Sequence, residues 1–446
     1  MTPDQKSLFR SHSTSQEFLF CKADAKPADG PAEDAAPVEL GKLTKAFPDI
    51  LAGKAFRDQA MAGLDGSSKF VALAVRIDGS GQTDPAGRSK PAADARMAVA
   101  KTIDTVCKSA NGIWGLLDGD IFGCFFPDND ESKALELVKS IKTYLAERGS
   151  RTVSIGIAVY PLIDFLKAQV LDNVRKALDH AAFFGPGSSA LFDAVSLNIS
   201  GDTFYQKKDI DGAIAEFKTA LRLDPSNVNV HNSLGVCYGV LGDFKRAEAE
   251  FEETIRLDPA ETMAIYNLGL VYLLTNNKKK ALEYFLKARE QAEDVFEVAF
   301  QTGKLYLEMG KPEEGKRFLE KAVSLKPESG LAFRFLGECC AAMNLTAEAV
   351  SAYKTAIRQN PNDADSLSAL GYLFDLQGEN PEITTIFCQQ SIDISPENSL
   401  FRYRLGSLYL KRNLLKEALE QFQKADELGH DAKKIIKKVR NLMQAV

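Results

Sequence analysis

A glycine that recurs along the C-terminal half of the chain constrains the fold more than any other feature. It stands at positions 201, 235, 269, 303, 337, 371 and 406, so the spacing is 34 residues, with one of 35 at the end. A small residue follows twelve positions later at 213, 247, 281, 315, 349 and 418, and prolines close most copies at 225, 259, 327, 361 and 396. This period predicts stacked helical hairpins, because one hairpin cannot bury its own apolar face.

Aromatic residues recur in phase with the glycines and predict how the hairpins pack. They stand three residues after the glycine and again four residues after the small residue, where they fill the space that glycine and alanine leave open. Two copies depart from the pattern. The fourth has Gly315 and Leu319, and the sixth has Thr384 and Cys388 together with one extra residue. We expect a local distortion in the sixth copy.

These residues and their spacing resemble the tetratricopeptide repeat (TPR) family. The resemblance implies an all-α right-handed superhelix of seven helical hairpins, and the amphipathic, basic end of the chain is expected to cover the last hairpin as a capping helix. The expected hairpins are 194–227, 228–261, 262–295, 296–329, 330–363, 364–398 and 399–430, and the capping helix is 431–446.

In the TPR family the first helix of each hairpin lines a concave groove that holds a protein or a peptide. Counting from each glycine places the exposed groove positions three residues before it, one residue after it and four residues after it, and the first two sets supply the candidate partner-binding side chains. The alternative is that individual side chains among them only cover the neighbouring hairpin. Asp202 stands where a clamp for a C-terminal carboxylate requires asparagine, so we do not expect that clamp. The candidates are Asn232, Tyr266, Leu270, Phe300, Lys304, Arg334, Glu338, Tyr372 and Tyr403.

The N-terminal half has a different pattern. Residues 1–37 are expected to be a tail and linker, in which 15–22 could add a short strand, and two short helices are expected within 38–63. From 69 to 192 apolar strands alternate with amphipathic helices in the order β-α-β-β-α-β-α-β, which predicts an α+β domain over 38–192. The expected segments are strands 69–78, 113–117, 121–127, 151–161 and 188–195 and helices 94–110, 131–149 and 170–185.

The stretches 70–78, 117–127, 153–161 and 173–188 resemble the GGDEF (diguanylate cyclase) family. An active member holds two divalent cations with carboxylates from its first strand and its signature hairpin. The positions that correspond to this nucleotide-cyclase-like site are altered, since an arginine replaces the leading carboxylate and an isoleucine replaces the second acid of the signature. The resemblance places them at Arg76, Asp78, Asp118, Gly119, Asp120, Ile121 and Phe122.

Two cyclase carboxylates are therefore missing and one positive charge is added. We expect no cyclase activity, no catalytic residues, no bound metal and no cofactor. Asp118 and Asp120 are either remnants of a nucleotide or single-metal site or residues that simply favour a hairpin turn. Residues 109–116 also lack the Arg-x-x-Asp of the family's product-inhibition site.

Composition limits the remaining classes of function. The net charge of −6 and the pI near 5.6 argue against a non-specific nucleic-acid binder. No segment is apolar and long enough to cross a membrane, no secretory signal is evident, and the 7 cysteines form no CxxC pair, which favours a cytoplasmic protein.

Together these features predict a bacterial-type, non-catalytic signalling scaffold that binds a protein or peptide in the TPR groove. The GGDEF-like domain would serve docking or regulation, or would form a homodimer. One alternative is a sensor of GTP or a cyclic dinucleotide that is coupled to partner binding. A weaker alternative is a residual cyclase that uses Asp78 and Asp120.

Overall fold

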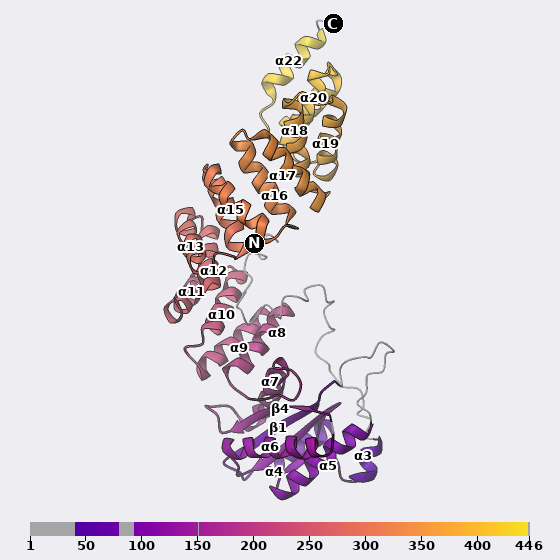
Figure 1. The fold of residues 1–446 in the computed structure, drawn as a ribbon, viewed down its shortest axis with the longest axis vertical. Helices are drawn as coiled ribbons and strands as arrows, with labels where there is room; N and C mark the ends of the chain where they lie inside the picture. The colour runs from indigo at the N-terminus through magenta and orange to yellow at the C-terminus, as the bar shows by residue number, and fades with distance from the viewer. Residues whose placement is uncertain (1–40, 80–92, 150, 445–446) are drawn as a thin grey trace. The chain divides into compact units, whose positions relative to one another are not determined.

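The computed structural model describes residues 41–79, 93–149 and 151–444 (Figure 1). The expected tail and linker, the strand within 15–22 and most of the loop at 78–91 lie outside these residues. The chain divides into two compact units, Met1–Pro259 and Ala260–Val446. The first unit includes the first two hairpins as well as the α+β region, and the expected domain boundary near residue 193 stays a prediction.

The first unit contains a five-stranded mixed sheet with the strand order β2-β3-β1-β4-β5. The central strand β1 is antiparallel to β3 and β4, whereas β4 and β5 are parallel. The predicted α+β architecture of this region is confirmed. The strands are β1 (Phe70–Ile77), β2 (Ile113–Asp118), β3 (Ile121–Pro127), β4 (Val153–Tyr160) and β5 (Ser189–Leu191).

Helices cover both faces of this sheet. Val71, Leu73 and Val75 of β1 form a core with apolar residues of α5 and α6 on one face. On the other face, Gly115, Gly123, Ala74 and Gly156 lie side by side across four strands. The helices are α3 (Gly41–Ala46), α4 (Gly53–Gly63), α5 (Ala93–Ser109), α6 (Glu131–Glu147), the short η1 (Lys167–Gln169) and α7 (Val170–Phe183).

This row of small residues allows two helices to approach the sheet closely. A Cβ atom at Gly115 would lie 2.4 Å from the ring of Phe56 in α4, and one at Gly156 would lie 2.3 Å from the backbone of α7. The small residues are therefore required by packing, and they fix where α7 lies relative to β1 and β4.

Two helical hairpins follow the sheet within the first unit, α8 (Ala194–Gln206) with α9 (Ile210–Leu223) and α10 (Val228–Leu241) with α11 (Phe244–Leu257). The last strand is shorter than expected because Asp193 already caps α8, where its side chain accepts a hydrogen bond from the Ser196 backbone. Lys176 of α7 pairs with Glu216 of α9 at 2.7 Å, which ties this hairpin to the α+β region.

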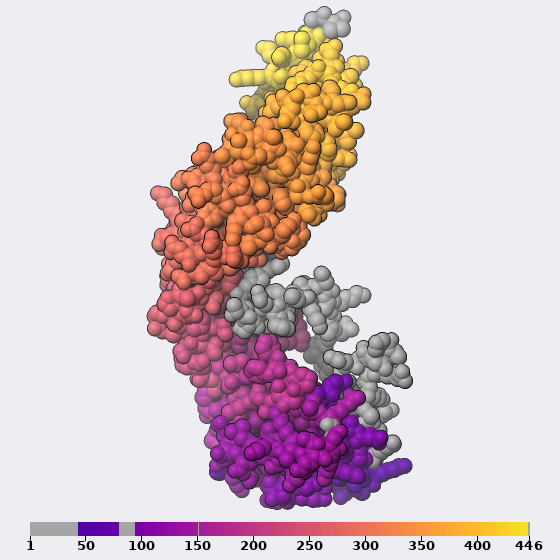
Figure 2. Space-filling model, viewed as in Figure 1, coloured from indigo at the N-terminus to yellow at the C-terminus, as the bar shows by residue number. Residues whose placement is uncertain are grey.

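The second unit consists of further helical hairpins, and Figure 2 shows its surface coloured from pink-red through orange to yellow. Each recurring glycine contacts the second helix of its own hairpin. A Cβ atom at Gly269, for example, would lie 2.7 Å from Phe285. Its helices are α12 (Thr262–Leu274), α13 (Lys278–Gln291), α14 (Phe296–Glu308), α15 (Pro312–Leu325), α16 (Gly330–Ala342), α17 (Thr346–Gln359), α18 (Ala364–Leu376), α19 (Pro381–Ile394), α20 (Ser399–Lys411), α21 (Leu415–Glu427) and α22 (Lys433–Gln444).

The irregularity expected in the sixth hairpin is confined to a turn. Helices α18 and α19 keep the ordinary lengths of 13 and 14 residues. The extra residue lengthens the turn 377–380 by one position relative to the turn 343–345, and Gly378 takes a left-handed φ of 71° there. At the C-terminal end, Ile436 and Val439 of α22 pack on Ala418 and Phe422.

Candidate functional site

Arg76 lies at the end of the central strand, where the resemblance places a metal-binding carboxylate in an active cyclase. Its guanidinium lies 3.7 Å from the carboxylate of Asp179 in α7. Ile121 stands directly opposite Arg76 across the β1–β3 pair. The altered position is therefore built into an ion pair between the sheet and the helix that covers it.

The two carboxylates of the β2–β3 hairpin, Asp118 and Asp120, also have arginine partners. Asp118 lies 2.5 Å from Arg175 of α7, and Asp120 lies 3.2 Å from Arg96 of α5. Arg96 also donates a hydrogen bond to the carbonyl of Gly119 at 3.1 Å. Both carboxylates are thus neutralised by cations from opposite sides of the hairpin.

Asp78, which directly follows β1, has a structural role. Its two carboxylate oxygens accept hydrogen bonds from the Ser154 hydroxyl and the Gly187 backbone, each at 2.6 Å. Phe122 is fully buried in the core. Over residues 41–79, 93–149 and 151–444 there is no group of three or more His, Cys, Asp or Glu side chains that could hold a metal ion.

Four of the expected groove residues are buried, namely Asn232, Tyr266, Leu270 and Phe300. The ring of Tyr266 lies 5.5 Å from that of Phe285, and burial raises the pKa of the Tyr266 hydroxyl. The expectation that these side chains are exposed is corrected by this packing. Helical spacing identified the face of each helix but not how deeply its side chains are covered.

The charged groove residues form a network of their own. Arg334 pairs with Asp365 at 2.7 Å and with Asp363 at 3.3 Å, and it lies 3.8 Å from Glu338. Lys304 lies over the ring of Phe335, 5.3 Å from its centroid. Burial, followed by the neighbouring carboxylates, raises the pKa of Glu338 even though Arg334 opposes that shift. These groups largely neutralise one another.

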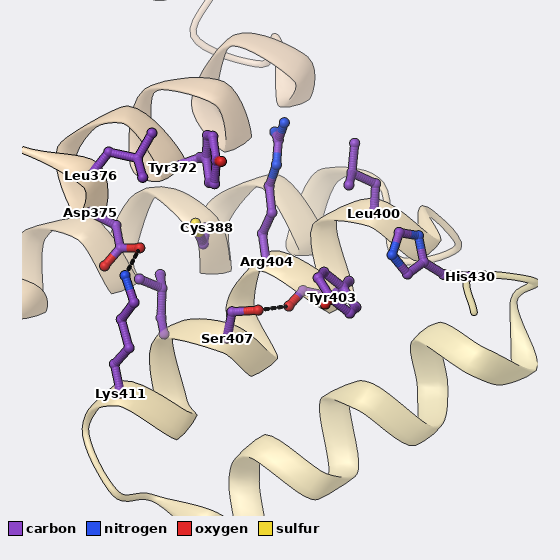
Figure 3. A pocket seen from close by; sticks show the side chains of 11 residues that line it. Tyr372, Asp375, Leu376, Cys388, Leu400, Tyr403, Arg404, Ser407, Lys411 and His430 are labelled. Carbon is purple, nitrogen blue, oxygen red and sulfur yellow. Dashed lines mark hydrogen bonds and ion pairs between the residues drawn. The ribbon is translucent and has the colours of Figure 1, made fainter. Parts of the chain in front are cut away.

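The last two expected residues, Tyr372 and Tyr403, line a pocket of about 420 Å³ in the second unit (Figure 3). The pocket lies between α18 and α20 and reaches His430 after α21. Tyr372, Leu376 and Leu400 keep 44%, 60% and 40% of their surface exposed, so apolar side chains of this unit face solvent at the pocket. Of the side chains that line the pocket, the candidates expected from the sequence include the two tyrosines.

Arg404 is the side chain at this pocket that sequence counting missed. It donates a hydrogen bond to the Ser368 hydroxyl at 2.8 Å, and its guanidinium lies 5.1 Å from the ring centroid of Tyr372. Burial lowers the pKa of Arg404 from its ordinary value. The available signal was its position two residues before Gly406, where the other hairpins have residues without charge at 199, 233, 267, 301, 335 and 369.

Two further contacts shape the pocket. Lys411 pairs with Asp375 at 2.5 Å, which neutralises both charges. The ring of His430 lies 4.3 Å from that of Tyr403, so it holds this tyrosine on the side of the pocket near Leu400. The pocket thus combines apolar walls with one cation that has a neutral hydrogen-bond partner.

Family models for the tetratricopeptide repeat match residues 201–242, 238–295 and 306–371. These matches support a TPR array in the C-terminal half, the class of protein that the paired helices define. TPR arrays are typically non-enzymatic scaffolds for protein interactions. No curated protein matches the chain. In the part of the chain that is described, no helix is long and apolar enough to cross a membrane.

Several solved structures are similar to part of the chain. YrrB, described as a TPR protein with an unusual peptide-binding site, is 22% identical over 42% of this chain and 95% of its own, with a TM-score of 0.38. MamA is 28% identical over 37% of this chain and 96% of its own, with a TM-score of 0.34. A TPR protein from Parabacteroides merdae is 17% identical over 56% of this chain and 98% of its own, with a TM-score of 0.40.

Proposed function

We propose that the protein is a non-catalytic scaffold whose C-terminal hairpins hold a segment of a partner protein in the pocket between α18 and α20. The observation that carries this proposal is the exposure of Tyr372, Leu376 and Leu400 around one cavity. Exposed apolar and aromatic side chains that surround a concave site are the usual anchors of an interface. Of the nine groove residues expected from the sequence, the proposal relies on Tyr372 and Tyr403.

We infer in addition that the α+β region is a degenerate GGDEF-like domain that does not cyclise GTP. Three ion pairs support this inference. They join Arg76 to Asp179, Arg175 to Asp118 and Arg96 to Asp120. A divalent cation would have to displace the bound arginines from the two hairpin carboxylates. In addition, Arg76 replaces the carboxylate that the first strand of an active cyclase supplies. The domain then contributes docking or regulation to the scaffold.

Affinity capture with the full chain tests the scaffold proposal. Wild type is compared with the double variant Tyr372→Ala/Leu376→Ala, which removes exposed surface and leaves the hairpin core unchanged. We expect that a protein recovered with wild type is not recovered with the double variant. Once purified, the same protein should bind wild type but not the double variant in calorimetry.

Ile386→Ala provides the matched control. Ile386 is 55% exposed on α19 of the same hairpin and does not line the pocket. Recovery of the partner should therefore match wild type. If the double variant Tyr372→Ala/Leu376→Ala recovered as much partner as wild type, the interface would lie elsewhere and the proposal would be contradicted.

A further inference from the structure

Arg404 lies at the centre of the C-terminal pocket and is partly buried there. Its side chain comes from α20, and its guanidinium packs against the Tyr372 ring from α18. Within the described residues no carboxylate lies within ion-pair distance of this guanidinium, and its hydrogen-bond partner is the neutral Ser368 hydroxyl. A guanidinium has five N–H donors, so most of its donors remain available to a ligand.

A carboxylate is the ligand group that best satisfies this site. A planar guanidinium can donate two parallel hydrogen bonds to a carboxylate, and such charge-assisted bonds are about twice as strong as neutral ones. The only other cation in the pocket wall, Lys411, is already neutralised by Asp375. The pocket therefore offers one strong site for a negative charge rather than a diffuse basic surface.

Apolar surface flanks Arg404 on both sides, as Figure 3 shows. Tyr372 and Leu376 lie on one side, and Leu400 lies on the other, near the rings of Tyr403 and His430, which contact each other at a tilt. A terminal carboxylate would fill only one of these two surfaces, because the chain would stop at Arg404. An acidic side chain within a peptide can place one apolar neighbour on each side.

We propose that this pocket binds an internal segment of a partner protein in which a glutamate or aspartate stands between two bulky apolar residues, with the acidic side chain paired to Arg404. This inference rests on the proposed scaffold function and specifies the chemistry of the partner. The two apolar side chains of the partner segment would bury the exposed Leu376 and Leu400. Its carboxylate would accept hydrogen bonds from the guanidinium of Arg404.

Fluorescence anisotropy with the full chain tests this chemistry. The probe is a fluorescein-labelled octapeptide, acetylated and amidated at its ends, with Leu-Glu-Phe at its centre. Matched probes carry Leu-Gln-Phe or Ala-Glu-Ala, and a fourth ends in a free carboxylate after Leu. We expect the Leu-Glu-Phe probe to bind about tenfold or more tightly than the Leu-Gln-Phe probe, since a hydrogen bond to a charged group is lost.

Protein variants assign the preference to Arg404. In Arg404→Gln the preference for glutamate over glutamine should disappear. Arg402→Gln is the matched control, because Arg402 lies on the same helix but binds the Pro396 carbonyl and Gln421 outside the pocket. This control should keep the full preference. Arg404→Lys retains the charge and should keep part of the preference, which covers the case in which Arg404→Gln does not fold.

The outcomes separate this inference from the scaffold proposal. Equal binding of the Glu and Gln probes to wild type would overturn the acidic-segment inference, and so would tightest binding by the free-carboxylate probe. In either case, if the probes bind wild type but not the double variant Tyr372→Ala/Leu376→Ala, the scaffold proposal would stand. If no probe binds and the double variant keeps its captured partner, both proposals fail.

Discussion

Arg96 and Asp120 join helix α5 to the β2–β3 hairpin, with the guanidinium nitrogen 3.2 Å from the carboxylate oxygen. The same guanidinium donates to the carbonyl of Gly119. A carboxylate that resembles a metal ligand in the sequence is thus a partner in the packing of the domain. Two predictions follow from this use of Asp120, one for catalysis and one for stability.

The first prediction is that the protein makes no cyclic dinucleotide from GTP and Mg²⁺. Asp118 and Asp120 are paired with arginines, and Arg76 stands where the resemblance to the GGDEF family places a metal ligand. On the proposed assignment, two divalent cations would lack their carboxylates. Chromatography of the reaction mixture should show unchanged GTP, and Mg²⁺ with GTP should leave the melting temperature unchanged. Product that disappears in Asp120→Ala would instead support a residual cyclase.

The second prediction concerns the stability of the hairpin. Arg96→Ala should lower the free energy of unfolding by about 1–2 kcal/mol, because it leaves Asp120 and the Gly119 carbonyl without their partner. Urea unfolding followed by circular dichroism measures the change. Lys108→Ala is the control, since Lys108 pairs with Asp104 on the surface and should change stability by less than about 0.5 kcal/mol. Equal effects of the two substitutions would contradict a structural role for Arg96.

The third prediction tests why glycine recurs in each hairpin. Alanine in a helix is ordinarily more stable than glycine by roughly 0.5–1 kcal/mol. At Gly235, however, the added Cβ would lie 2.7 Å from the ring of Phe251. Gly235→Ala should therefore destabilise the protein by about 1–3 kcal/mol, the usual effect of overpacking. Thermal and urea unfolding should both show this sign.

Gly66→Ala provides the comparison for Gly235→Ala. A Cβ atom at Gly66 would meet no atom within 4 Å, and its backbone is outside the left-handed region. This substitution should leave stability within about 0.5 kcal/mol of wild type. A stabilising Gly235→Ala would show that the glycine is not required by the approach of α11.

The sequence predicted the parts of the fold that depend on local spacing. The period placed the glycines and the aromatic residues that meet them, because both belong to one hairpin. It did not predict that Tyr266 and Phe300 are buried, since these side chains also contact Gln301 and Phe335, which lie in the hairpins that follow.

The sequence predicted only part of the candidate site, because the site also depends on contacts between hairpins. Tyr372 and Tyr403 fall at the expected positions relative to glycine. Arg404 does not, and its importance appears only when Ser368 and Tyr372 of the preceding hairpin are placed beside it. Likewise Arg175 and Arg96 neutralise the hairpin carboxylates from α7 and α5, which no local motif reveals.

The fourth prediction is a pH dependence at His231 in the second hairpin. Its Nδ1 lies 2.7 Å from Glu250, and its Nε2 lies 3.1 Å from the Pro225 carbonyl. The Glu250 hydrogen bond, helped by that carbonyl, raises the pKa of His231. A raised folded-state pKa stabilises the fold fully below the unfolded value of about 6.5, and this stabilisation is lost as the pH rises through the folded pKa.

Urea unfolding of wild type and His231→Gln at pH 5.5 and pH 8.5 measures this effect. Wild type should exceed the variant by about 1 kcal/mol at the lower pH, because both ring nitrogens of the charged imidazole then donate to acceptors, and by less at the higher pH. In a Glu250→Gln background the pH dependence of the difference should shrink, because the neutral amide no longer favours the imidazolium. A difference that grows with pH would mean that the neutral imidazole is the form held in the fold.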